Sequence, residues 1–89
     1  MEQHHESTKQ VINRLSRAIG HLEAVRNMVE EGRDCSEVLV QLAAVKAAIN
    51  NTGKLVLKDH MKHCVAEAVQ NGDQDALDAL SDAIDRFVK

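Results

Sequence analysis

The chain has 89 residues, a formal net charge of −3, no Pro, Trp or Tyr, and a single Phe, a composition that predicts one small domain, residues 1–89, that is helical throughout. No stretch approaches the roughly 18 consecutive apolar residues of a membrane span, and the polar segment MEQHHESTKQ does not resemble a secretory signal. We therefore expect a cytoplasmic protein without a membrane partner, whose two reduced cysteines suit metal binding or redox chemistry more than a structural disulfide.

The first predicted helix runs from Ser7 or Thr8 to Glu31. Apolar residues recur along it at three- and four-residue spacing, which is typical of an amphipathic helix. Ser7 or Thr8 is the expected N-cap, and Gly32 is expected to end the helix in a left-handed conformation. Residues 1–7 are expected to form a flexible tail.

The second predicted helix runs from about Asp34 to Asn71, with Asp34 or Ser36 as its cap and Glu37 placed as in a capping box. Some 36 residues of helix extend about 50 Å, which exceeds the diameter of a compact domain of this mass. The first helix covers only part of that length, so we expect a helical homodimer or a higher oligomer. The run NNTG at residues 50–53 is poor in helix formers and is the one place where this helix is open to a break.

The third predicted helix runs from Asp73, its N-cap, to about Val88 and places four apolar residues on one face: Leu77, Leu80, Ile84 and Phe87. The predicted fold is thus an all-α protomer of three helices. Residues 67–89 carry six acids against two basic residues, so the basic potential lies in the first two-thirds of the chain. A local basic patch there is sufficient for nucleic-acid binding even though the whole chain is acidic.

A cysteine and histidine pattern on the second helix predicts a metal site. His60 and Cys64 are four residues apart and share one helix face, whereas Cys35 lies about 37 Å away along the axis of the same helix. Cys35 and Cys64 of one chain therefore cannot meet, but an antiparallel pair of these helices brings Cys35 of one protomer beside the other two ligands of its partner. This donor set suits trigonal Cu(I) best, or Ni(II), Co(II) or Zn(II) with a fourth ligand.

The motifs RLSRAIGHLEAVRNMVEEGRDCSEVLVQLAAVKAAI and LKDHMKHCV resemble the copper-sensitive operon repressor (CsoR) family, which also includes nickel, cobalt, formaldehyde and persulfide sensors. The resemblance extends from about Val11 to Phe87. It implies that two three-helix protomers form an antiparallel four-helix bundle and that two such dimers form a tetramer. It further implies a repressor that binds operator DNA without inducer and releases it when the cross-protomer site is filled.

Matched residue by residue, the resemblance assigns the inducer ligands to Cys35, His60 and Cys64 and the DNA-contacting residues to Arg14, Arg17 and Lys46. His4 and His5 lie about where nickel and cobalt sensors take a further ligand, although a plain polar tail is the simpler interpretation.

Three positions depart from the pattern of the copper sensors. Asp34 stands where many of them carry a Tyr, Ala79 or Leu80 where many carry a Glu, and His21 where the family carries a Gln. The first two changes remove partners that orient metal ligands in those sensors, so they leave the inducer open. His21 falls on the face of Arg14 and Arg17, where it either contacts phosphate or lies at the surface.

Three functions therefore remain open at this point. The first is a Cu(I)-responsive repressor, with Ni(II) or Co(II) as other inducers of the same fold. The second is a repressor that senses reactive sulfur species through Cys35 and Cys64 of different protomers. The third is a cytosolic metal-binding protein with no DNA role. An enzyme is not expected, because the sequence has no glycine-rich phosphate loop and no nucleophile elbow.

Overall fold

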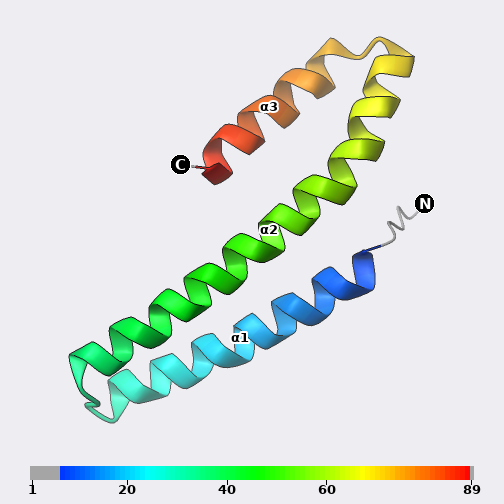
Figure 1. The fold of residues 1–89 in the computed structure, drawn as a ribbon. Helices are drawn as coiled ribbons and strands as arrows, with labels where there is room; N and C mark the ends of the chain where they lie inside the picture. Colours follow the sequence, from blue (N-terminus) through cyan, green and yellow to red (C-terminus); the bar gives the residue numbers. More distant parts are fainter. Residues whose placement is uncertain (1–6, 89) are drawn as a thin grey trace.

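The computed structural model describes residues 7–88, without the side chains of residues 60 and 61, so most of the predicted tail lies outside it. The described residues form three helices, α1 (Thr8–Glu30), α2 (Cys35–Asn71) and α3 (Gln74–Val88). The prediction of an all-α, three-helix protomer is confirmed. Figure 1 shows α1 lying along the first part of α2, while α3 folds back along its second part. Within residues 7–88, α1 and α3 each pack on α2 and do not contact each other.

Glycines follow the first two helices, and the sequence predicted this role for Gly32. Gly32 and Gly72 have φ angles of 73° and 63°, in the left-handed region that glycine enters without steric cost. After α1, the amides of Gly32 and Arg33 donate to the carbonyls of Val29 and Met28 at 3.1 and 2.9 Å, which is the Schellman arrangement. This tight ending sends the chain directly back into α2 and produces the α1–α2 hairpin.

The N-caps follow the predictions in part. Asp34 Oδ2 accepts from the amide of Ser36 at 3.0 Å, and Asp73 Oδ1 accepts from the amide of Ala76 at 3.1 Å. The predicted capping box at α2 is wrong, because the carboxylate of Glu37 accepts instead from the guanidinium of Arg33. Ser7 occupies the cap position of α1 but makes no side-chain cap bond, and its hydroxyl is buried without a partner.

The helix α2 is continuous through residues 50–53, so the break that NNTG allowed does not occur. Thr52 is buried, and its hydroxyl donates to the carbonyl of Ala48 at 2.8 Å within the helix. Gly53 has a packing role, because the ring of Phe87 from α3 lies where a β-carbon at residue 53 would be. The poor helix formers of this run are thus held in the helix by contacts with α1 and α3.

The single chain has a thin core. The buried hydrophobic residues are Ala18, Val25, Val45 and Ala68, and large apolar side chains remain exposed on α1 and α2. The molecule extends 54 Å along its longest axis and 17 Å along its shortest. Apolar side chains left in water at this density are typical of a chain whose core is completed by another protomer.

No helix in the described part of the chain has the length and apolar character needed to cross a membrane.

Candidate functional site

One side of α2 carries residues in a strict heptad pattern. Starting at Cys35, the spacing alternates between four and three residues up to position 60, and we call these positions the seam: Cys35, Leu39, Leu42, Lys46, Ile49, Gly53, Val56 and His60. Such a repeat keeps one line of side chains facing a partner helix. The exposed fractions of Leu39 and Ile49 are 66% and 44%, so the first part of the seam is open in the single chain. Its second part, at Gly53 and Val56, lies against α3.

An apolar strip on α1 extends the same surface. Ile12, Leu15, Ile19 and Leu22 follow each other at spacings of three, four and three residues, and all are exposed. We call this strip together with the seam the apolar face of the hairpin. Both helices thus direct large side chains to one side of the hairpin, where they stay exposed among residues 7–88 except at the part of the seam that α3 covers.

Both cysteines, Cys35 at the start of the seam and Cys64 one helical turn beyond its last residue, are free and exposed. Cys35 begins α2 and Cys64 lies about 43 Å farther along its axis, so one chain cannot bring them together. Among the described side chains, no group of three or more His, Cys, Asp or Glu residues could hold a metal ion. The side chain of His60 is outside the described part of the structure, as are His4 and His5.

Asp34 has a structural role beside the first candidate ligand. Its carboxylate caps α2 through the amide of Ser36, which makes Cys35 the first residue of the helix. Next to it, Arg33 pairs with Glu37 at 3.3 Å and with Glu31 at 3.9 Å. The hydrogen bond that Arg33 donates to the Glu37 carboxylate raises the pKa of Arg33 above its ordinary value. Asp34, which stands where many copper sensors are expected to carry a Tyr, therefore fixes the helix start from which Cys35 projects.

Leu80 is one of the two candidates, with Ala79, for the third-helix position at which many copper sensors are expected to carry a Glu. It lies with Val56, Ile84 and Phe87 in an apolar hollow between α2 and α3. The Leu80 side chain therefore helps to pack the third helix onto α2, as its apolar character requires.

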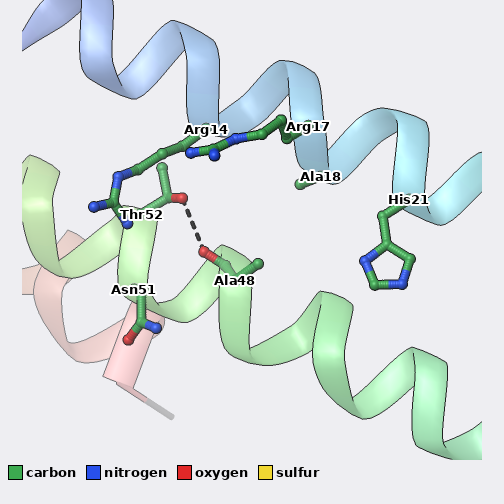
Figure 2. A pocket seen from close by; sticks show the side chains of 7 residues that line it. All are labelled: Arg14, Arg17, Ala18, His21, Ala48, Asn51 and Thr52. Carbon is green, nitrogen blue, oxygen red and sulfur yellow. Dashed lines mark hydrogen bonds between the residues drawn. The ribbon is translucent and has the colours of Figure 1, made fainter.

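A basic hollow lies between α1 and α2, turned away from the seam. It measures about 240 Å³, and we call its polar lining the basic face: Arg14, Arg17, His21, Asn51 and Thr52. Figure 2 shows both arginines projecting from α1 over the segment of α2 that carries Asn51 and Thr52. No acidic side chain lines the hollow, and within residues 7–88 neither arginine forms an ion pair. Uncompensated guanidinium groups around a hollow are suited to bind phosphate oxygens.

His21 makes a contact that the sequence did not predict. It shares the hollow with Arg14 and Arg17, as its spacing indicated, but its Nε2 also donates to Oε1 of Gln41 on α2 at 2.7 Å. The sequence contained one signal for this contact, the Gln of the Cys-x-x-V-L-x-Q motif. This Gln lies six residues after Cys35, a spacing that matches no pair of metal ligands, so it pointed to a role other than metal binding. Pairing it with His21 requires the register of the hairpin.

Lys46 lies apart from the two arginines within one chain. It occupies the seam and borders a hollow with Ile49 and Phe87, whereas the arginines border the hollow on the other side of α2. A single protomer therefore does not unite the three predicted DNA-contacting residues on one surface.

Comparison with known proteins identifies the family. A family model described as metal-sensitive transcriptional repressor matches residues 7–86. The chain belongs to this family. It is 43% identical over 89 residues to the copper-sensing transcriptional repressor CsoR of Bacillus subtilis (strain 168), an alignment that covers 96% of this chain and 88% of the relative. The resemblance inferred from the motifs is confirmed.

Solved structures give the same result for the fold. The copper-sensing repressor CsoR with Cu(I) from Geobacillus thermodenitrificans NG80-2 matches with a TM-score of 0.86 at 36% identity and covers 100% of this chain and 94% of that one. The nickel-responsive transcriptional regulator InrS matches with a TM-score of 0.74 at 42% identity over 98% and 99% of the two chains. The family consists of transcriptional repressors and not of enzymes, in agreement with the sequence.

Proposed function

We propose that the protein is a cytoplasmic repressor that binds operator DNA in its inducer-free state and is released by Cu(I). The metal would be held by Cys35 of one protomer and by His60 and Cys64 of its partner, in two equivalent sites per dimer. The observation that carries this proposal is the seam, which runs from Cys35 to His60 and is exposed among the described residues at Leu39, Leu42 and Ile49.

The seam has the symmetry that an antiparallel dimer requires. Its spacing reads four, three, four, three, four, three, four in either direction, so it is unchanged when the helix is reversed. A twofold axis between Ala47 and Ala48 sets Cys35 opposite the partner's His60 and Leu39 opposite the partner's Val56. The same register sets Leu42 against the partner's Gly53 and the Phe87 ring beside it. One rotation therefore pairs seam residues with each other, Lys46 with the partner's Ile49 among them, and brings Cys35 and His60 together at both ends.

The donor atoms favour a soft metal. Two thiolates and one imidazole are the ligands that Cu(I) prefers in three-coordinate sites. The named relatives support this choice, because the Bacillus subtilis protein is called copper-sensing and the Geobacillus structure contains Cu(I). When bound, the ion would cross-link two protomers through opposite ends of their longest helices.

The basic face supports DNA binding. The guanidinium groups of Arg14 and Arg17, which form no ion pair within residues 7–88, are available to backbone phosphates, and each protomer of a tetramer would contribute one such hollow. Lys46 would join them from the edge of the seam, since its long stem can carry the ammonium group away from apolar neighbours. Binding that rests on phosphate contacts weakens steeply with salt.

Two other inducers have specific support. The likeness to a nickel-responsive regulator favours Ni(II), with Co(II) and Zn(II) as related ions and His4 or His5 as a further ligand. Free, exposed cysteines favour a reactive sulfur species that would join Cys35 to the partner's Cys64 through a disulfide or polysulfide bridge. That reaction needs no imidazole ligand, so a His60→Ala variant separates it from metal sensing.

The test is a DNA-binding titration of the reduced protein on its own promoter region, without inducer and with Cu(I), Ni(II) or a persulfide donor. We expect salt-sensitive binding by the inducer-free protein and release by Cu(I). In the His60→Ala variant, release by Cu(I) should be lost. Absence of salt-sensitive binding under every condition would favour a metal-binding protein without a DNA role.

A further inference from the structure

A side-chain hydrogen bond crosses the α1–α2 hairpin at its midpoint. Nε2 of His21 donates to Oε1 of Gln41 over 2.7 Å, and both side chains are half-buried. A bond of this length is well formed, and partial burial reduces competition from water. It joins residues twenty positions apart on two different helices, so it depends on how α1 lies against α2.

The two partners belong to the two functional regions. His21 follows Arg17 by one helical turn and lines the same hollow, as Figure 2 shows. Gln41 follows Cys35 by six residues, which is about 9 Å along the axis of α2. The bond thus connects the segment of α1 that carries the arginines to the segment of α2 that begins at the candidate inducer ligand.

Around this bond the helices meet through small side chains. Ala18 and Val25 of α1 and Val45 of α2 are the buried residues of this part of the hairpin. Small apolar side chains interdigitate little, so they resist a sliding motion of one helix along the other less than large ones do. A directional polar contact is then well placed to fix the register of the hairpin.

We propose that the His21–Gln41 hydrogen bond is a positioning contact that holds the arginines of α1 in the DNA-binding arrangement and weakens when inducer draws Cys35 toward the partner protomer. This inference rests on the proposed repressor function and names residues that regulate it. Coupling between two sites requires a contact whose free energy differs between the two states. The bond meets this need if it is formed without inducer and strained or broken with it.

The test compares DNA affinity with and without Cu(I) in a set of variants: His21→Leu, Gln41→Leu, the double variant, His21→Gln and Gln41→Glu. The leucine variants remove the bond, whereas His21→Gln keeps an N–H donor and Gln41→Glu keeps an acceptor. Asn27→Ala, an exposed side chain on the same helix, is the matched control.

We expect each leucine variant to weaken DNA binding by the inducer-free protein by about two- to tenfold, the range expected for one hydrogen bond, and to leave the affinity of the Cu(I)-loaded form unchanged. The double variant should be no worse than the single ones, since the pair acts as a unit. His21→Gln and Gln41→Glu should recover the native ratio of DNA affinity without Cu(I) to DNA affinity with Cu(I). Both variants also provide folded proteins for comparison with the leucine variants.

The salt dependence separates positioning from direct binding of phosphate. If His21 only positions the arginines, the slope of log affinity against log salt stays the same in His21→Leu, whereas removal of a phosphate-binding group would make it shallower. An affinity ratio in His21→Leu equal to that of the native protein would overturn the inference. If the native protein itself does not bind DNA or does not release it with Cu(I), the proposed function fails instead.

Discussion

The two faces of the α1–α2 hairpin differ in what the single chain leaves unsatisfied. On the apolar face, Leu39, Leu42 and Ile49 remain exposed, whereas on the basic face the guanidinium groups of Arg14 and Arg17 have no ion pair among residues 7–88. Exposed apolar area calls for a second protein surface, and uncompensated positive charge calls for an anion. A pair of helices has two open sides, so one thin hairpin can bind a second protein surface on one side and an anion on the other.

The largest expected effect follows from a charge placed in the seam. Leu42→Asp should prevent dimer formation, because each buried unpaired carboxylate costs about 3–5 kcal/mol at the interface. Sedimentation velocity should show monomer, and Cu(I) binding should be lost with it. Val69→Asp is the matched control, since Val69 is 63% exposed on the same helix but outside the seam. A Leu42→Asp protein that keeps the native oligomeric state would contradict the role of the seam.

The next effect tests how the seam accommodates the third helix. Gly53→Ala should lower the free energy of unfolding by about 1–3 kcal/mol, because the added methyl group meets the ring of Phe87. Urea denaturation measures this change. Gly20→Ala is the control, because a β-carbon there meets nothing within 4 Å and alanine favours a helix. Equal free energies of unfolding for Gly53→Ala and Gly20→Ala would show that the packing of Phe87 does not depend on the space at Gly53.

On the basic face, the expected effect is on DNA alone. Arg17→Ala should weaken DNA binding and make the salt slope shallower by about 1 for each phosphate that the arginine neutralises in the native complex. The oligomeric state and Cu(I) affinity should not change, because Arg17 lies away from the seam. Arg26→Ala provides the comparison, since Arg26 is exposed on the same helix and pairs with Glu30 at 3.5 Å. If Arg26→Ala weakened DNA binding as much as Arg17→Ala, the hollow would have no special role in DNA binding.

The smallest expected effect concerns the start of α2. Asp34→Ala should lower stability by about 1 kcal/mol, because the amide of Ser36 loses its acceptor. Asp34→Asn keeps a capping oxygen and should remain close to the native value in thermal unfolding. If both variants are as stable as the native protein, Asp34 does not set the helix start beside Cys35.

The sequence was sufficient for much of the fold because caps and glycine stops act locally. Asp34, Asp73, Gly32 and Gly72 end or begin helices where their own chemistry requires it. The second helix was predicted from about Asp34 to Asn71, but the sequence left a break at NNTG open, since the side chain that fills the space at Gly53 comes from the other end of the domain. Tertiary packing there outweighs local propensity.

The candidate site, like the fold, was predictable from the sequence only in part. Helix length and spacing were enough to propose that Cys35 and Cys64 act in different protomers, because one straight helix separates them. Arg14 and Arg17 came from a resemblance, and their common hollow with Asn51 appears only when α1 is placed against α2. The partner of His21 required the same register, which no local pattern encodes.

The cross-protomer site is the central claim, and subunit mixing tests it most directly. A Cys35→Ser protein and a Cys64→Ser protein each lack an intact site in their homodimers. In a mixed dimer, Cys35 of the second variant meets His60 and Cys64 of the first, which restores one complete site. Cu(I) titration against a competing chelator should therefore find no tight site in either variant and one per dimer after co-refolding. Absence of a restored site in verified mixed dimers would contradict the account.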